Sequence, residues 1–438
     1  MDVPDVRYAR GGGVAIAYQV VGDGPVDLVY APHLTNLWSL WTSPRTAVFL
    51  RKLSDVVRLT VFNPRGTGLS DRPRNVTLEA RMDDINIVLD ALEVERATLF
   101  GVAESANVCA LYAATYPDRC ERLALFRPYA RSVRTETYPY GSSEEEWLAS
   151  IRTMRERFGD IDLFIEWARA IDPAILEDGE EFENFVWMHR LSVSPSAAAD
   201  FARMQMDTDV TDVLGSIRVP TAILCRTAGR DPARYVAERI PGAEFIEFGG
   251  QSFSPYSADV ADTLLAFVQG ESRPAIPDSV LATVLFTDLV GSTERAAALG
   301  DRRWSELLER HHEAVRRELV RFRGTEVDSA GDGFFCRFDG PARAIACARS
   351  IIEGAKTLEL VVRAGVHTGE CELVGGKIAG IAVVTGARIS SSAGVGEVLV
   401  SSTVKDLVAG SGLEFADRGE RELKGVPGLW RLYSVVDA

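Results

Sequence analysis

The sequence predicts an α/β protein of two domains, in which a doubly wound sheet with a helical cap precedes a smaller α+β domain. Three observations support this fold class. Short apolar runs alternate with helix-like stretches through residues 1–270, a helix-rich segment interrupts them at about 135–210, and a polar segment with two prolines precedes a new apolar run. At 438 residues the chain is also too long for one ordinary core.

The first domain, residues 1–270, is expected to contain a mostly parallel sheet. Near-continuous apolar runs are typical of strands that are covered on both faces. The runs are Val26–Pro32, Arg58–Pro64, Ala97–Ala103, Arg122–Pro128, Thr221–Thr227 and Glu244–Gly250. The segment from about 135 to 210 is rich in Trp, Phe and charge, with a helix predicted over Glu144–Phe158. We interpret this segment as an inserted cap.

A linker is predicted at 271–279, and the second domain at 280–438. The linker is polar and contains Pro274 and Pro277. The apolar run Val280–Phe286 then predicts the first strand of the new domain. Apolar residues recur at mostly three- and four-residue steps over 301–322, which predicts an amphipathic helix. These residues are Trp304, Leu307, Leu308, Val315, Leu319 and Phe322.

Composition narrows the function classes. The net charge is −15 and the pI is about 5.0, which argues against non-specific nucleic-acid binding because that needs a basic surface. A nucleotide ligand is still allowed, since bound metal ions neutralise phosphate charge locally. No apolar run approaches the roughly 18 residues of a membrane helix, and Met1–Asp5 does not resemble a signal peptide. Six cysteines without a CxxC motif favour free thiols in a reducing cytoplasm.

The first domain contains a strand-to-helix motif of a known enzyme scaffold. The segment Phe62–Asp71 reads FNPRGTGLSD, and a later strand runs into Gly101–Ser105, which reads GVAES. On these segments residues 8–268 resemble the α/β-hydrolase family. In that family Gly-x-Ser-x-Gly forms a strained turn that presents the serine hydroxyl for attack. Ala103 occupies the serine position here, and a methyl group cannot attack a carbonyl.

The other catalytic positions that this resemblance implies are also altered. Phe253 stands where the family's histidine is expected, and Asp231 matches the acid without an imidazole to orient. Neither His33 nor His189 has the right chain position. Ser105 lies off the turn and lacks activation and nearby oxyanion donors. We expect a scaffold kept for folding and dimer contact, or a pocket that binds a small apolar ligand without cleaving it.

Two aspartates of the second domain lie in Gly-rich turns, each after a strand-like run. Asp288 is within Phe286–Thr293 (FTDLVGST), and Asp332 is within Gly331–Phe335 (GDGFF). Three further motifs follow in order, at Gly380–Arg388, Gly396–Ser401 and Glu422–Gly428. On these five motifs, residues 280–436 resemble the catalytic domain of class III adenylate and guanylate cyclases.

The resemblance implies a reaction with two divalent cations. One would lower the pKa of the ribose 3′-hydroxyl that attacks the α-phosphorus, and the other would hold the triphosphate and the departing pyrophosphate. Mg²⁺ and Mn²⁺ prefer carboxylate oxygens, and Asp288 and Asp332 match the family's metal ligands. Gly291-Ser292-Thr293 can begin a helix whose free N–H groups face the phosphates. The alternative is that both aspartates are ordinary turn residues.

The residues at the base-recognition positions are reversed in sign relative to the family. The family's lysine is Asp328 here, and its aspartate is Lys377. Asp328 could accept from the N6 amine of adenine while Lys377 donates to N1, or the pair could meet N1–H, N2–H and O6 of guanine. Hydrogen-bonding capacity therefore leaves ATP and GTP open. The two side chains could also simply pair with each other.

Three further positions bear on the rate. Val384 replaces the family's transition-state asparagine, and losing that polar group costs on the order of 2–4 kcal/mol, or roughly 10²–10³ in rate. Arg388 retains the family's arginine, and Lys424 matches its triphosphate lysine, so both can stabilise charge. We therefore expect weak turnover rather than none.

The resemblance also implies a homodimer with two shared sites. In the family, the metal aspartates and the base-recognising residues of one site come from different subunits. His311 and His312 lie in the middle of the predicted helix, where we expect surface or interface residues and not ligands.

The sequence as a whole predicts a cytoplasmic cyclase that makes cyclic AMP from ATP, with GTP as second choice and Mg²⁺ or Mn²⁺ as cofactor. The rival hypothesis is a non-catalytic nucleotide-binding or scaffolding dimer. Val384 and the reversed base-recognition pair favour the rival, while the two aspartates, Arg388 and Lys424 favour the enzyme. An esterase is disfavoured by Ala103 and Phe253.

Overall fold

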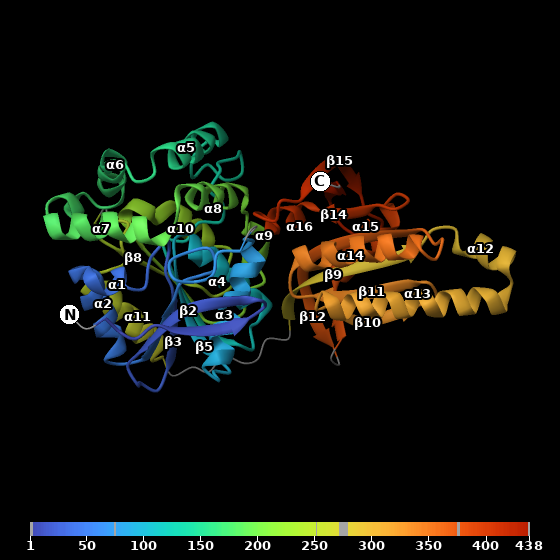
Figure 1. Ribbon diagram of the computed structural model, residues 1–438, viewed down its shortest axis with the longest axis horizontal. Helices are drawn as coiled ribbons and strands as arrows, with labels where there is room; N and C mark the ends of the chain where they lie inside the picture. Colours follow the sequence, from blue (N-terminus) through green and yellow to red (C-terminus); the bar gives the residue numbers. More distant parts are fainter. Residues whose placement is uncertain (1–2, 74–75, 251, 271–278, 375–376, 437–438) are drawn as a thin grey trace. The chain divides into compact units, whose positions relative to one another are not determined.

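A computed structural model describes the chain except for residues 1–2, 74–75, 251, 271–278, 375–376 and 437–438 (Figure 1). Its contacts divide the chain into two compact units, Met1–Pro277 and Asp278–Ala438. The predicted linker at 271–279 falls almost wholly outside the described residues. Within the described ranges, no helix has both the length and the hydropathy needed to cross a bilayer. All six cysteines are buried and free.

The first unit is built on an eight-stranded sheet in the order β1-β2-β4-β3-β5-β6-β7-β8. Every neighbouring pair from β4 to β8 is parallel, whereas β1 and β2 form an antiparallel hairpin at one edge. All six predicted strands are present, and the hairpin is an addition to them. The strands are β1 (Arg7–Gly11), β2 (Val14–Val21), β3 (Asp27–Ala31), β4 (Arg58–Phe62), β5 (Ala97–Val102), β6 (Cys120–Phe126), β7 (Thr221–Arg226) and β8 (Glu244–Phe248).

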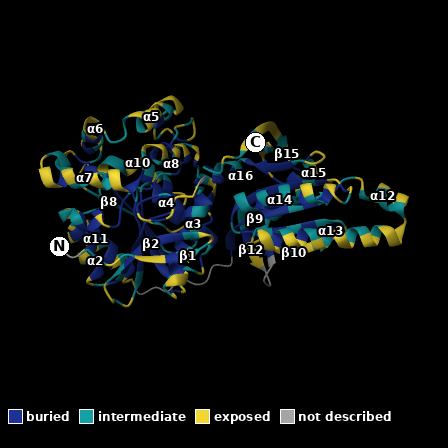
Figure 2. Ribbon diagram, in the orientation of Figure 1, coloured by how far each residue is buried: buried dark blue, intermediate teal, exposed yellow. Residues whose placement is uncertain are grey.

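Helices cover this sheet, and the central strands are buried almost throughout (Figure 2). The reason is the near-continuous apolar sequence of those strands, since each face must be packed against a helix. The covering elements are α1 (Ser39–Thr42), α2 (Pro44–Ser54), α3 (Leu78–Ala91), α4 (Glu104–Thr115), α9 (Thr211–Leu214), η2 (Thr227–Gly229), α10 (Arg230–Ala237) and α11 (Ala258–Val268).

The cap predicted at about 135–210 is helical. It contains α5 (Glu144–Arg157), α6 (Ile161–Ile171), η1 (Pro173–Leu176), α7 (Gly179–Ser192) and α8 (Pro195–Asp207). A capping box begins α5, in which Ser143 and Glu146 satisfy each other's backbone N–H groups. Ser194 caps α8, which has Pro195 in its first turn. These local signals explain why the inserted segment forms separate short helices.

The second unit is also built on a single sheet, in the order β10-β11-β9-β12-β14-β16-β15, with β13 paired to β12. Most neighbouring pairs are antiparallel, and β12 and β14 are parallel. The strands are β9 (Ser279–Leu289), β10 (Thr325–Ala330), β11 (Gly333–Phe338), β12 (Val362–Val374), β13 (Lys377–Ala379), β14 (Val398–Ser401), β15 (Glu414–Glu422) and β16 (Leu429–Val436). The predicted α+β class is confirmed.

Helices lie on both faces of this second sheet. α13 (Asp301–Arg321) and α14 (Pro341–Lys356) pack on one face, and α15 (Ile381–Ser392) packs on the other. α12 (Ser292–Leu299) and α16 (Ser402–Leu407) complete the unit. Two glycines let α15 approach closely: a Cβ on Gly365 would lie 2.1 Å from the Ser390 nitrogen, and one on Gly386 would lie 2.5 Å from Val284 Cγ2. This contact fixes α15, which carries two of the predicted site positions, Val384 and Arg388.

Candidate functional site

Asp288 and Asp332 lie at the same end of two neighbouring strands. The register pairs Phe334 of β11 with Thr287 of β9. Asp288 is the next residue of β9, and Asp332 is in the turn immediately before β11. Gly331 adopts a φ of 62° in that turn, a conformation that glycine adopts without strain. The strand pairing therefore brings the two predicted metal ligands together from positions far apart in the sequence.

In each of the two carboxylates, one oxygen has no hydrogen-bond partner among the residues that the structure describes. Oδ2 of Asp332 is buried without a hydrogen-bond partner, and the hydrogen bonds to Asp288 go to its Oδ2 and leave Oδ1. A buried oxygen without a partner is costly, whereas a hard divalent cation would satisfy it. In the described part of the chain no group of three or more His, Cys, Asp or Glu is placed to hold a metal. An ion here would take further ligands from water and phosphate, which suits Mg²⁺.

Arg363 holds Asp288 from the adjacent strand, where the register places the two residues opposite each other. Its Nε and Nη2 donate to Asp288 Oδ2 at 3.0 and 2.5 Å. Its Nη1 donates to the carbonyl oxygen of Ser391, near the end of α15, at 3.4 Å. Sequence reasoning missed this residue. The available signal was a single charge in an otherwise apolar strand, Val362–Val366.

Arg388 and Lys424 are neighbours. Arg388 Nε donates to the backbone carbonyl of Lys424 at 3.0 Å. Arg388 lies on α15, and Lys424 lies in the loop between β15 and β16. Val384 is one turn before Arg388 on the same helix, with 39% of its side chain exposed. The structure thus brings the predicted charge-stabilising residues together, beside the position that lacks the expected asparagine.

Asp328 is exposed on β10, and its Oδ1 accepts a hydrogen bond from the backbone N–H of Ser329 at 3.1 Å. Phe335 lies opposite it on β11, and the Phe335 ring stacks on that of Phe286 with centroids 4.6 Å apart. Lys377 begins β13, but its side chain lies outside the described residues. The suggested pairing of Asp328 with Lys377 therefore stays a prediction.

The expectation that His311 is a surface residue is wrong. Only 1% of its surface is exposed, because its helical face is the one that packs on the sheet through Val315 and Leu319. Burial is the main cause that lowers the pKa of His311 to about 4, and the neighbouring His312 adds to it. His312 is more accessible and contacts the carbonyl oxygen of Gly331 through Nε2 at 3.1 Å.

In the first unit, the strained turn between β5 and α4 is present without a nucleophile. Ala103 adopts φ 53° and ψ −116°, a conformation that residues other than glycine rarely occupy. The Ser105 hydroxyl is buried: it accepts from the backbone N–H of Val102 at 2.8 Å and lies within hydrogen-bonding distance of the carbonyl oxygens of Ala31 and Val102. The Ser105 hydroxyl is therefore occupied by backbone hydrogen bonds and is not presented to a substrate.

The other expected catalytic positions do not form a charge relay. The Phe253 ring stacks on the guanidinium of Arg127, with Cζ 3.9 Å from the ring centroid. Asp231, the candidate acid, is exposed at the start of α10 and pairs with Arg230 at 3.2 Å. The correspondence of Asp231 to a triad acid is therefore not supported by its position.

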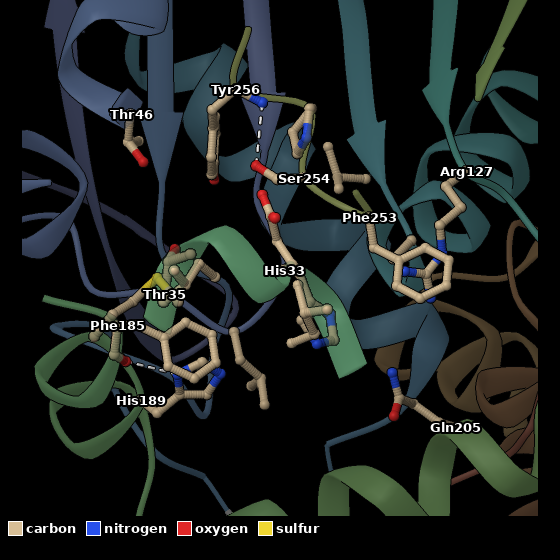
Figure 3. Close-up of a pocket in the computed structure, with 18 of the residues that line it drawn as sticks. His33, Thr35, Thr46, Arg127, Phe185, His189, Gln205, Phe253, Ser254 and Tyr256 are labelled. Atoms are coloured by element: carbon tan, nitrogen blue, oxygen red, sulfur yellow. Dashed lines mark hydrogen bonds between the residues drawn. The ribbon is translucent and has the colours of Figure 1, made fainter. Parts of the chain in front are cut away.

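Ala103 and Phe253 both line a cavity of about 460 Å³ between the sheet edge and the cap (Figure 3). Cap and core are tied at its wall: Phe253 N–H donates to the carbonyl of Ile171 at 2.9 Å, and Ser252 and Arg45 both donate to Asp172 at 3.0 Å. Volumes of 300–1,000 Å³ are typical of small-molecule sites. A cavity is therefore present at the two positions where the expected serine and histidine are replaced.

A buried charge cluster lies beside this cavity and was not predicted. Glu104, the residue after the elbow, forms an ion pair with Arg81 and a 3.1 Å hydrogen bond with Nδ1 of His33. Glu104 and Arg81 are almost completely buried. Their charges compensate each other, as buried charges must. The sequence signal was Glu104 itself: an acidic residue at the start of a mostly apolar helix needs a cationic partner when the helix is buried.

Comparison with known families agrees with this geometry. Residues 277–436 match the family model described as the adenylate and guanylate cyclase catalytic domain, and residues 35–159 match that of the α/β hydrolase fold. The second unit thus matches the model of the nucleotide cyclase catalytic domain over almost its whole length. The cyclase domain follows an α/β-hydrolase-fold domain in the same chain, as the motifs predicted.

Individual relatives cover each domain separately. RutD from Caulobacter sp. (strain K31), provisionally named a carbamate hydrolase, is 25% identical over 286 residues, 60% of this chain and 99% of RutD. The enol-lactonase from Burkholderia xenovorans LB400 covers 60% of this chain and 100% of its own, with 22% identity and a TM-score of 0.52. The adenylyl cyclase CyaB from P. aeruginosa covers 36% of this chain and 95% of its own, with 23% identity and a TM-score of 0.35. The lactonase likeness shows the fold of the first domain alone.

Proposed function

We propose that the cyclase domain converts ATP into cyclic AMP and pyrophosphate with weak turnover, as a homodimer with two shared sites. The observation that carries this proposal is the meeting of Asp288 with the turn of Asp332, each with a carboxylate oxygen free of described protein partners. Such a pair is suited to divalent cations. A purely structural role for Asp332 would leave its buried oxygen unexplained.

Bound Mg²⁺ or Mn²⁺ would supply the acidity of the ribose 3′-hydroxyl and neutralise the triphosphate. In this proposal Asp288 and Asp332 hold the cations, and Arg363 orients the Asp288 carboxylate through its two hydrogen bonds. Arg388 and Lys424 stabilise charge on the phosphates. Val384 has no polar group to orient the ribose, which is the reason for weak turnover.

The preference for ATP over GTP belongs to this proposal. Asp328 is exposed, and its Oδ2 has no hydrogen bond within the described residues, so it can accept from the N6 amine of adenine. The exposed positions of Arg388, Val384 and Lys424 are consistent with a site that a second subunit completes. GTP is the alternative substrate, because the same carboxylate can accept from N1–H and N2–H of guanine.

We infer that the hydrolase-fold domain has lost hydrolysis and modulates the cyclase. Ala103 lacks a nucleophilic atom, Phe253 lacks a base, and the Ser105 hydroxyl is buried against backbone carbonyls. A retained cavity of about 460 Å³ favours ligand binding over a scaffold that serves folding alone.

The proposed cyclase activity is tested with purified protein, Mn²⁺ and either ATP or GTP, with the cyclic product measured by chromatography. We expect cyclic AMP to form faster than cyclic GMP, and Asp288→Ala and Asp332→Ala to reduce the product to background. Arg302→Gln, on the exposed face of α13, is the matched control and should retain activity. If product formation equals that of Asp288→Ala for both nucleotides, the domain only binds nucleotide.

The loss of hydrolysis is tested with p-nitrophenyl esters. We expect no release of p-nitrophenol above the buffer rate, because neither Ala103 nor Phe253 can take part in acyl transfer. Hydrolysis by the purified protein that persists in Ser105→Ala would show that another residue acts as the nucleophile, and the proposed inactivity would be wrong.

A further inference from the structure

The cavity of the hydrolase-fold domain contains an arginine whose charge is not compensated. Arg127 lines the cavity, and within the described residues no carboxylate forms a hydrogen bond or an ion pair with its guanidinium. The other two arginines of the lining differ, since Arg45 pairs with Asp172 and Arg131 with Asp209. The acidic residues of the lining also have partners. Asp172 accepts a hydrogen bond from Arg45, and Glu181 accepts from Ser43 and from the Arg45 backbone N–H. One unmatched positive charge therefore faces the cavity.

The fold places Arg127 at this position despite a conformational cost. Its φ is 50°, which is unfavourable for a residue with a side chain. Its side chain passes Gly229 so closely that a Cβ there would lie 2.7 Å from Arg127 Cγ. It then stacks on Phe253 (Figure 3). Stacking on an aromatic ring stabilises a cation but does not neutralise it.

Two arginines, Arg127 and Arg81, act on His33 at this wall of the cavity, and of the two Arg81 is paired with Glu104. Burial, followed by the charges of Arg81 and Arg127, lowers the pKa of His33 to about 3. His33 lines the cavity, and its Nδ1 lies 3.1 Å from the Glu104 carboxylate. Ala103 also lines the cavity and immediately precedes α4, so the positive end of that helix dipole lies at the same wall. Desolvation of a cation without a partner is costly, and an anionic ligand would offset this cost.

Apolar side chains contribute most of the rest of the cavity surface, so most of a bound molecule would contact hydrocarbon. They include Val102, Ile171, Ile175, Phe185 and Met188, and polar groups such as Ser39, Thr46 and Gln205 lie among them. We propose that the cavity binds a small carboxylic acid with an apolar body, and that Arg127 anchors its carboxylate. The apolar wall agrees with the small apolar ligand expected from the sequence, and Arg127 adds a requirement for negative charge. This site lies within the first unit and does not depend on the proposed cyclase reaction.

The charge requirement is tested first on the unmodified full-length protein by isothermal titration calorimetry. Phenylacetate and hexanoate are compared with phenylacetamide and hexanamide, which have the same shape without the charge. We expect at least one acid to bind about tenfold or more tightly than its amide, because charge-assisted hydrogen bonds to arginine are strong. Equal affinity for acid and amide, or no acid with a Kd below about 1 mM, would overturn the proposal.

The anchor is tested with Arg127→Gln. We expect this variant to bind the acid about tenfold or more weakly and to lose the distinction between acid and amide. Arg152→Gln, an exposed arginine of α5 outside the cavity lining, is the matched control and should bind like the unmodified protein. An unchanged affinity in Arg127→Gln would place the carboxylate elsewhere and contradict the assignment. If this variant does not fold, the comparison of acids with amides still decides.

Discussion

Arg363 and Asp288 face each other across β12 and β9, and Nε and Nη2 of the arginine both donate to the same carboxylate oxygen, Oδ2. The orientation of the other oxygen, Oδ1, is thereby fixed, and Oδ1 makes no hydrogen bond to the described residues. An ion pair that is about one-third exposed contributes little to stability. Its main effect is therefore orientation of the carboxylate.

We predict that Arg363→Gln raises the half-saturating Mn²⁺ concentration of the cyclase reaction. Loss of a group that orients a metal ligand typically costs 10–100-fold in metal affinity or activity. The measurement is the initial rate as a function of Mn²⁺ at saturating ATP. Arg418→Gln removes an arginine paired with Glu397 and serves as control. An unchanged Mn²⁺ dependence in Arg363→Gln would remove the positioning role.

Val384→Asn is expected to increase turnover. The position is exposed on α15, one turn before Arg388, so the helix can accept an amide there. A well-placed polar group at a reacting centre is worth on the order of 10²-fold in rate, and we expect kcat to rise by up to about that factor. Val395→Asn, the same change at a 71% exposed loop position, should leave kcat unchanged. Equal rates for all three proteins would show that Val384 is not beside the ribose.

Ala103→Gly should stabilise the hydrolase-fold domain. A non-glycine residue in a rare backbone conformation costs of order 1–3 kcal/mol, so we expect the free energy of unfolding to rise by about 1 kcal/mol. Ala149→Gly, on an exposed turn of α5, should instead lower it by roughly 0.5–1 kcal/mol. Urea denaturation of both variants checks the opposite signs. A loss of stability in Ala103→Gly would mean that the methyl group contributes more by packing than the turn costs.

The cyclase domain should lose stability in mild acid because of His367. Its ring is buried, with Nδ1 2.9 Å from Ser401 Oγ, and burial lowers its pKa to about 4. The native state keeps this ring neutral, whereas the unfolded chain takes up a proton below about pH 6.5. The neutral buried ring therefore makes its full contribution to the free energy of unfolding above pH 6.5. As the pH falls towards 4, that free energy decreases by on the order of 2–3 kcal/mol.

Urea denaturation between pH 7.5 and pH 4.5 tests this prediction. His367→Gln removes the titrating group, so its unfolding free energy should fall less steeply with acid than that of the unmodified protein. His312→Gln, the same replacement at a more accessible position of this domain, is the comparison variant. Parallel pH profiles for His367→Gln and the unmodified protein would assign the acid sensitivity to other groups.

The sequence predicted the elements whose signal is local. Strands that are buried on both faces consist of nearly continuous apolar runs, and the helix at 301–322 has apolar residues at three- and four-residue spacing. Both kinds of element were therefore predicted. The β1–β2 hairpin was missed although β2 is largely apolar and buried, because β1 is short and mostly exposed and only Gly12 and Gly13 separate the two strands. His311 was misplaced because a histidine on the apolar face of a helix is buried when its neighbours pack, whatever its polarity.

The site was predictable only where motifs exist. Asp288, Asp332, Arg388 and Lys424 were named from their motifs, and the register and one hydrogen bond then showed which of them are neighbours. Two arginines were not predicted: Arg363, which hydrogen-bonds Asp288, and Arg127, which lines the cavity. Each is a charge in or after an apolar strand. Only the fold shows that Arg363 has an aspartate opposite it, and that Arg127 stacks on Phe253 without a carboxylate partner among the described residues.

The backbone around Ala103 still has the shape for which a serine would be selected. One base change in the gene turns an alanine codon into a serine codon, yet that change alone would supply a hydroxyl with no imidazole to receive its proton. Replacing Phe253 as well would break its stacking on Arg127. A serine at position 103 and a histidine at position 253 would thus have to be introduced together, and the second change would also remove the aromatic contact of Arg127.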